Sequence, residues 1–162
     1  MIQVIKPGDE NQKVEHSVTV FLAGSIEMGA SSLWQNDVIK HLEQIKTDVT
    51  IFNPRRDGWN SSWEQKQSNP NFNEQVNWEL DKLDESLIIF MYFDPNTKSP
   101  ISLLELGKFI GSNMVVCCPE GFWRKGNIEI LCTRQNTPLY TDFDSAIGAL
   151  LTKISEGNRY GY

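Results

Sequence analysis

The chain has 162 residues, with 15 Lys and Arg against 21 Asp and Glu, which gives a formal net charge of −6. This acidic balance excludes a protein that binds a nucleic-acid polymer through a basic surface, because such binding depends on phosphates that lysine and arginine neutralise. It leaves open a nucleoside or another small ligand, which needs only a local pocket. The length predicts one domain over residues 1–162 that needs no disulfide or metal to fold. Residues 1–16 and 156–162 are expected to be terminal extensions.

The first residues and the few metal-binding side chains indicate a cytoplasmic protein without a resident metal. The N-terminus lacks the basic segment and apolar run of a signal peptide, and no apolar run approaches the ~20 residues of a membrane helix. We therefore expect a cytoplasmic location and no membrane partner. The three cysteines form no CxxC pair and the two histidines lie far apart, which favours reduced core thiols over a metal site or a disulfide. No cofactor is expected.

Short apolar runs alternate with amphipathic segments along the chain. Strands are predicted over Val18–Ala23, Val49–Phe52, Ser86–Phe93, Met114–Cys118 and Pro138–Tyr140. Helices are predicted from Ser31 or Ser32 to about Ile45, and over Phe72–Glu85, Ile101–Ile110, Asn127–Arg134 and Asp142–Ile154. Strands that are apolar on both faces and alternate with helices are typical of a parallel sheet covered on both sides. The predicted fold class is α/β: a doubly wound, five-stranded, mainly parallel sheet, flavodoxin-like or Rossmann-like, with strand order 2-1-3-4-5.

Ligands of such sheets bind at the carboxyl ends of the strands, near the point where the strand order switches. The loops predicted to meet there are Gly24–Ala30, Asn53–Asn71, Asp94–Pro100 and Pro119–Gly126. The second loop is long and polar, and loops of that length inside a domain are usually functional or disordered. Its residues Trp59 and Trp63 favour an ordered loop. We expect the functional side chains in these loops or at the start of the helices that follow them.

One residue of the helix predicted over Ile101–Ile110 does not fit its surroundings. At about 100° per residue, Glu105 lies on the same stripe as Ile101 and Phe109, in a helix that is apolar nearly all round and therefore expected to be largely buried. A carboxylate there is costly unless it is paired or faces a cleft. Two interpretations stay open: an ion pair with Lys108 on a partly solvated edge, or a carboxylate that faces the ligand site.

The helix before the third predicted strand contains a second carboxylate of this kind. Glu79 follows Asn77 and Trp78 and precedes the apolar position Leu80. A solvated charged face is the usual role for such a residue on an amphipathic helix. A role in the ligand site is the alternative, and this segment alone does not decide between the two.

Four segments, in this order, resemble the nucleoside 2-deoxyribosyltransferase superfamily. They are FLAGSI at Phe21–Ile26, NWELDKLDES at Asn77–Ser86, SPISLLELG at Ser99–Gly107 and GNIEI at Gly126–Ile130. With NPRRDGW at Asn53–Trp59, the set is most similar to the deoxyribosyltransferase-like branch. The resemblance extends over roughly residues 18–147, and the shared order of the motifs makes it more specific than any motif alone.

The resemblance implies a role for each matching residue. Glu105 would be the nucleophile that attacks C1′ of a 2′-deoxynucleoside. Glu79, next to Asn77 and Trp78, would bind the nucleobase. Asn127 would reach the sugar 5′-hydroxyl, in the family often from a neighbouring subunit, so the resemblance implies a homo-oligomer with shared active sites. The pocket floor and the cover of the base would be formed by Ala23, Gly24, Ser25, Arg55, Arg56, Asp57 and Trp59. For the loop at Arg55–Trp59, a surface loop with Arg–Asp pairing is an equal alternative.

The sequence also departs from the family pattern. The strand-one tyrosine that orients the nucleophile in founding members is Phe21 here, and an acidic residue six positions before the nucleophile is Ser99. Ser102 or the loop at Asn53–Asn71 would have to replace the lost hydrogen-bonding groups. Related nucleotide hydrolases bind a 5′-phosphate after the GSI turn, where this chain has Glu27, which would repel a phosphate. Free nucleosides are therefore favoured over nucleotides.

The function implied is the transfer of 2-deoxyribose between nucleobases by double displacement, in nucleotide salvage. Glu105 would form a covalent sugar ester and Glu79 would help the base to leave, as the two groups of a retaining glycosidase do. Ile101 and Phe109 would exclude water from the ester. The expected partners are a 2′-deoxynucleoside and a free nucleobase. The alternatives are a nucleoside N-glycoside hydrolase on the same scaffold and a non-catalytic nucleoside-binding module, which the loss of the tyrosine at Phe21 would favour.

Overall fold

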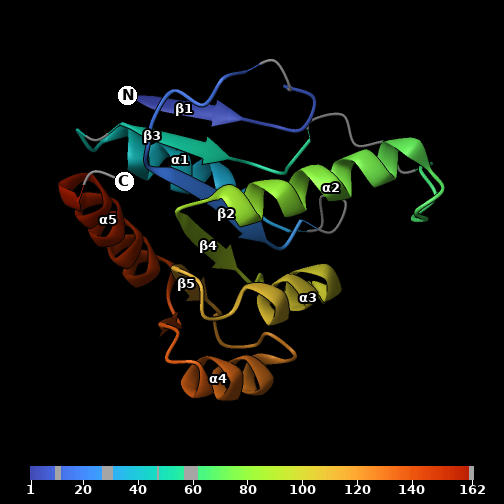
Figure 1. Cartoon of the computed structure of the whole chain (residues 1–162). Coiled ribbons are helices and arrows are strands. Elements are labelled where there is room, and N and C mark those ends of the chain that lie inside the picture. Colours follow the sequence, from blue (N-terminus) through green and yellow to red (C-terminus); the bar gives the residue numbers. More distant parts are fainter. Residues whose placement is uncertain (10–11, 27–30, 47, 57–61, 161–162) are drawn as a thin grey trace.

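Among the residues that the structure describes, six parallel strands form one sheet in the order β1-β3-β2-β4-β5-β6 (Figure 1). The structure is a computed structural model, and it describes residues 1–9, 12–26, 31–46, 48–56 and 62–160. The strands are β1 (Ile2–Ile5), β2 (Thr19–Gly24), β3 (Val49–Phe52), β4 (Ile88–Tyr92), β5 (Met114–Cys117) and β6 (Leu139–Tyr140). The helices are α1 (Trp34–Glu43), α2 (Pro70–Glu85), α3 (Pro100–Phe109), α4 (Lys125–Arg134) and α5 (Phe143–Tyr160).

The predicted fold class is confirmed, with one strand more than the sequence indicated. The five predicted strands are β2 to β6, and their order across the sheet is the predicted 2-1-3-4-5. The sixth, β1, lies in residues 1–16, which were expected to form an extension, and it pairs along the edge from Ile2 opposite Val49 to Ile5 opposite Phe52. Its four residues, IQVI, are too few to show a strand pattern, and their pairing depends on the exposed edge of β3. At the other end, α5 continues past Ile154 to Tyr160.

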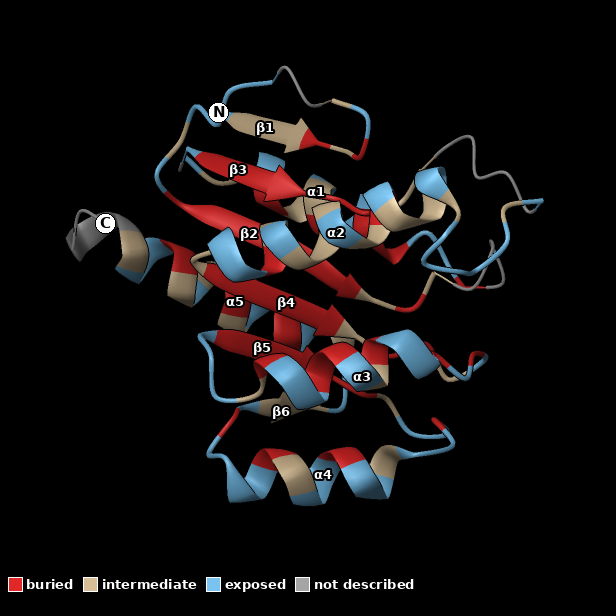
Figure 2. Ribbon diagram, turned by 45° about the vertical axis from the view of Figure 1, so that its right-hand side comes forward, coloured by how far each residue is buried: buried red, intermediate tan, exposed pale blue. Residues whose placement is uncertain are grey.

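Two helical layers cover the sheet. Helices α1 and α5 pack on one face, while α2, α3 and α4 pack on the other (Figure 2). The central strands supply both cores because successive side chains point to opposite faces. In β2, for example, Phe21 faces the α2–α4 layer and Leu22 faces the α1–α5 layer. The strands are therefore apolar throughout, as expected for a sheet covered on both faces.

The start of α1 differs from the prediction that Ser31 or Ser32 caps this helix. The helix begins at Trp34, and the residue before it makes no capping hydrogen bond through its side chain. The Ser31 hydroxyl donates instead to the Ile26 carbonyl at 3.0 Å, and the Ser32 N–H donates to Asp94 Oδ2 at 2.9 Å. Both serines thus hold the segment after β2 rather than the helix end, because tertiary partners compete with the local cap.

Two other helices begin with a side-chain cap. Asn69 accepts a hydrogen bond from the Phe72 N–H at 3.1 Å, so α2 begins at Pro70, two residues before the predicted start. Asp142 accepts from the Ser145 N–H at 2.8 Å, which confirms the predicted cap of α5. Among the described residues, no helix is both long enough and apolar enough to cross a membrane.

Candidate active site

Two carboxyl groups from neighbouring helices form the centre of the candidate site. Glu105 lies in the second turn of α3, the helix that follows β4, and its side chain is 9% exposed. Glu79 lies on α2, the helix that precedes β4, and is half-buried. Burial, and secondly the charge of Glu79, raise the pKa of Glu105 to about 8. Burial raises the pKa of Glu79 to about 7, against the opposing effects of a hydrogen bond from Gln75 and the charge of Arg56. The charge of Glu79 thus disfavours ionisation of Glu105, and the two groups are called the carboxyl pair below.

The ion-pair interpretation of Glu105 is wrong. The Lys108 ammonium lies 3.2 Å from Asp84 Oδ1 on α2, so it neutralises a different carboxylate. Within the described part of the chain, the Glu105 carboxyl group accepts no hydrogen bond and forms no ion pair. A largely buried residue whose carboxyl group has a raised pKa is typical of a functional site, because burial makes its charge costly to maintain.

The apolar surroundings expected for Glu105 are present on one side only. Phe109 is buried, but Ile101 is 60% exposed and Leu104 is 70% exposed. The prediction of a largely buried α3 is therefore wrong for the surface that carries these two residues. Helix α3 covers the sheet with one face only, and its apolar composition does not show which face that is.

Glu79 belongs to a hydrogen-bonded chain and not to a solvated helix face. Gln75, one helical turn earlier, donates from Nε2 to Glu79 Oε1 at 2.5 Å and to the Pro54 carbonyl at 3.3 Å. Arg56 donates from Nε to Gln75 Oε1 at 2.6 Å. The guanidinium also lies over the Trp63 ring, 5.4 Å from its centroid. The segment after β3 is thereby tied to α2 next to the carboxyl pair.

Three buried hydroxyl groups fix the loop that leads into α3. The oxygens of Ser25, Thr97 and Ser99 lie 2.6–3.0 Å from one another. The Asp94 N–H donates to Ser25 Oγ at 2.8 Å, and Thr97 Oγ1 lies 2.9 Å from the Asp94 carbonyl oxygen. Ser99 precedes Pro100 with a left-handed backbone, φ 47°, which non-glycine residues rarely adopt. This cluster joins the end of β2 to the loop after β4 and so determines where α3, with Glu105, begins.

The Asp94 carboxylate also stabilises the loop between β4 and α3. Its two oxygens accept from the backbone N–H groups of Ser32 and Asn96, each at 2.9 Å. Burial opposes the charge, but these hydrogen bonds outweigh it and lower the pKa of Asp94. Asp94 is therefore an ionised structural anchor at this end of the sheet.

Gly24 is required by the sheet itself. Its φ of 132° is a backbone conformation that residues with a side chain rarely adopt, and a Cβ atom there would lie 2.1 Å from the Tyr92 carbonyl oxygen. Close approach to a ligand was the reason expected for a small residue here. The structure gives a reason that the sequence did not indicate, the close approach of β4, whose Tyr92 carbonyl oxygen accepts a hydrogen bond from the Ser25 N–H at 2.9 Å.

The remaining residues that were predicted to bind the base and the sugar have different surroundings. Ala23 is buried in the core. Asn77 is exposed and donates to Asn73, so its side chain lies along the outer surface of α2. Trp78 packs on Phe21, with ring centroids 6.3 Å apart. The structure buries Ser102 in the first turn of α3.

Arg55 holds two loops together. Its Nη1 atom lies 3.1 Å from the Ser32 carbonyl oxygen and 3.3 Å from Gln35 Oε1, so it joins the segment after β3 to the segment after β2. The alternative of Arg–Asp pairing in this loop involves Asp57, which, like Trp59 and Glu27, lies outside the described residues.

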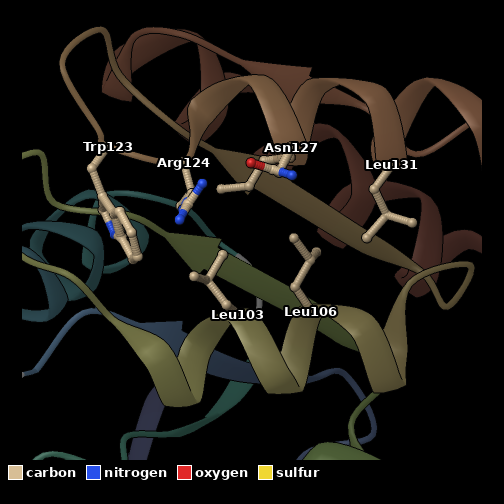
Figure 3. Close-up of a pocket in the computed structure, with 7 residues that line it drawn as sticks. Leu103, Leu106, Trp123, Arg124, Asn127 and Leu131 are labelled. Atoms are coloured by element: carbon tan, nitrogen blue, oxygen red, sulfur yellow. The ribbon is translucent and has the colours of Figure 1, made fainter.

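Asn127 lines a groove that contains neither residue of the carboxyl pair. It is an exposed residue of α4 and lines a groove of about 300 Å³ between α3 and α4 (Figure 3). The other lining residues are Leu103, Leu106, Trp123, Arg124, Ile128 and Leu131. Glu105 is not among the residues that line this groove, and within the described residues no hydrogen bond joins it to Asn127.

Sequence reasoning missed the residues that hold the site together, Gln75, Asp94 and Thr97. Gln75 stands four positions before Glu79, a spacing that places two side chains next to each other on a helix, so it could have been found. Asp94 and Thr97 act through partners far along the chain, and local spacing does not indicate such contacts. No cluster of potential metal ligands is present among the described residues.

A comparison with protein families identifies the relationship. A family model described as nucleoside 2-deoxyribosyltransferase like matches residues 17–122, which are 106 of the 162 residues. This range contains β2 to β5 and both carboxyl groups of the pair. A search among curated proteins found no match. By its sequence match and by its doubly wound parallel sheet, the chain belongs to the nucleoside 2-deoxyribosyltransferase-like family.

Proposed function

We propose that this protein transfers 2-deoxyribose between nucleobases by double displacement, with Glu105 as the nucleophile and Glu79 as the proton carrier at the base. The observation that carries the proposal is the carboxyl pair: Glu105 is buried, its pKa is raised in part by the charge of Glu79, and Glu79 is held by Gln75. The substrates proposed are a free 2′-deoxynucleoside and a free nucleobase.

In the first step the Glu105 carboxylate attacks C1′ and forms a C–O bond while the C1′–N bond to the base breaks. The electron pair of that bond stays on the base nitrogen, which takes up the proton of Glu79. The charge that develops on the sugar is positive, and an anionic Glu105 next to C1′ stabilises it. In the second step an acceptor base attacks C1′ with its nitrogen and gives its N–H proton to Glu79, and the ester bond to Glu105 breaks.

This mechanism requires one proton on the pair. The productive form has an anionic Glu105 and a protonated Glu79. Because the pKa of Glu79 is raised to about 7 and that of Glu105 to about 8, the pair carries one proton between these values. Productive binding places that proton on Glu79. The total proton count stays the same.

Hydrolysis is a second candidate, favoured by the exposure of α3. Ile101, which was expected to keep water from the ester, is 60% exposed. If water reaches C1′ in place of an acceptor base, the same intermediate breaks down to free 2-deoxyribose.

We also propose that Asn127 serves the site of a second copy of the chain. Its place in the α3–α4 groove, whose lining does not include Glu105 of the same chain, supports this arrangement. Mixing a Glu105→Gln protein with an Asn127→Ala protein tests it. If sites are shared, subunit exchange creates some sites with both native residues, and activity rises above that of either variant. Activity that stays at the level of the separate variants contradicts the sharing.

The function is tested by incubating the protein with deoxyinosine, with and without adenine, and separating the products by chromatography. New deoxyadenosine supports transfer, free hypoxanthine without acceptor supports hydrolysis, and unchanged deoxyinosine in both arms refutes either activity. Glu105→Gln should abolish turnover, with Glu43→Gln, at an exposed position of α1, as the matched control. A mass increase of one deoxyribosyl group on the native protein, absent from Glu105→Gln, would identify the ester.

A further inference from the structure

Gln75 connects Arg56 to Glu79, and the chemistry of its partners determines the orientation of its amide. The Nε–H of arginine can only donate, so the Gln75 atom 2.6 Å from it is the carbonyl oxygen. The amide NH₂ group therefore faces two acceptors, the Pro54 carbonyl oxygen at 3.3 Å and Glu79 Oε1 at 2.5 Å. Gln75 is 2% exposed, so water does not compete for these contacts.

This orientation distinguishes the two oxygens of Glu79. An amide N–H that faces Oε1 requires that atom to be an unprotonated acceptor. When Glu79 carries a proton, the proton is therefore on Oε2. A carboxylic acid whose proton has a defined position can donate along one direction, which general acid catalysis requires.

We propose that Gln75 is a positioning residue of the sugar-transfer site: held by Arg56, its amide keeps Glu79 Oε1 as an acceptor and so places the proton exchanged with the nucleobase on Oε2. This inference rests on the proposed function. The Oε2 proton passes to the nitrogen of the departing base as the C1′–N bond breaks and the C1′–O bond to Glu105 forms. The N–H proton of the incoming base returns to Oε2 when the ester breaks.

The charged groups around Glu79 have opposite effects on its ionisation. Arg56, from the segment after β3, stabilises the Glu79 anion directly and through the amide. From α3 the facing group is Glu105, whose charge disfavours a second anion, while Lys108 of that helix is paired with Asp84. Loss of the Gln75 N–H therefore raises the pKa of Glu79 and leaves its proton free to occupy either oxygen.

Two substitutions at Gln75 separate positioning from simple packing. Gln75→Leu removes the contacts to Arg56 and to Glu79. Gln75→Glu keeps an acceptor for Arg56 but presents an oxygen, not an N–H, to Glu79 Oε1. If Gln75 only anchors Arg56, Gln75→Glu retains kcat. If it positions the proton, both variants lose kcat about tenfold or more, with a smaller change in KM. Gln67→Leu, at an exposed position before α2, is the matched control.

The second readout is the titration of Glu79 itself, followed by ¹³C NMR in protein with labelled glutamate carboxyl groups and assigned with Glu79→Gln. We expect the midpoint to rise by about one pH unit or more in Gln75→Leu, because a hydrogen bond to a charged group is lost. Arg56→Met, at a half-buried position, should raise it as well, and it serves if the Gln75 variants fail to fold.

The proposal is overturned if the titration midpoint of Glu79 is unchanged in Arg56→Met and in each Gln75 variant that folds. It is also overturned if Gln75→Glu has the native kcat and the native pH profile. If the native protein turns over no deoxynucleoside but the Glu79 midpoint moves in the variants, the proposed function fails, while the contact of Gln75 with the Glu79 carboxyl group is confirmed.

Discussion

The ionised Glu105 carboxylate should lower the free energy of unfolding of the native protein, and the size of this decrease follows from the pKa of Glu105. Burial and the Glu79 charge raise the pKa from 4.5 to about 8, so the folded protein binds one more proton than the unfolded chain between these values. Raising the pH across this window therefore lowers the free energy of unfolding, by ~1.4 kcal/mol per pH unit. At pH 7 the accumulated cost is ~3 kcal/mol, and above pH 8 it approaches ~5 kcal/mol.

Glu105→Gln removes the ionisable group and keeps the shape. We expect the variant to be more stable than the native protein at pH 7, by up to ~3 kcal/mol, with the gain absent near pH 4.5. Urea unfolding of both proteins at several pH values between 4.5 and 9 measures the difference. The change in packing does not depend on pH, so the slope of the difference against pH isolates the ionisation.

Glu43→Gln provides the control, because its exposed side chain should give a difference near zero at every pH. If Glu105→Gln raises the free energy of unfolding by the same amount at pH 5 and at pH 8, then ionisation of Glu105 does not destabilise the native protein as argued. A loss of stability that grows with pH would show that the Glu105 carboxylate has a stabilising partner.

Three further outcomes follow from the same contacts. The pH profile of kcat/KM should be bell-shaped with its maximum between about pH 7 and 8, because turnover needs one proton on the pair; a rate that stays flat from pH 6 to 9 contradicts this. Glu79→Gln should lower the pKa of Glu105 below 8 but leave it above 4.5, since burial is the larger cause, and carboxyl NMR measures it. Gly24→Ala should cost more than ~3 kcal/mol in urea unfolding, because its Cβ would overlap the Tyr92 carbonyl oxygen. Gly148→Ala, in an open part of α5, should instead gain up to ~1 kcal/mol, and equal effects at the two glycines would contradict the argument.

The amino-acid sequence by itself determined the layered α/β fold, while the order of its five strands was predicted only as the order typical of a flavodoxin-like sheet. The fold could be predicted because runs such as Val18–Ala23 are apolar on both faces, and only a sheet covered on both sides buries such a strand. It also singled out Glu105, because a carboxyl group within an apolar helix is a local inconsistency that one chain segment can reveal. The edge strand β1 could not be predicted in this way, since its pairing depends on β3, more than forty residues away.

Only the tertiary structure decided how the site is built. Whether Glu105 is paired depended on the direction of Lys108, which turns toward Asp84 on another helix. The burial of Glu79 and its link to Arg56 depend on how α2 packs against the segment after β3. The physical reason is the same in each case: side-chain spacing within a helix is a local property, whereas burial, pKa and hydrogen-bond partners depend on groups that the fold brings from elsewhere.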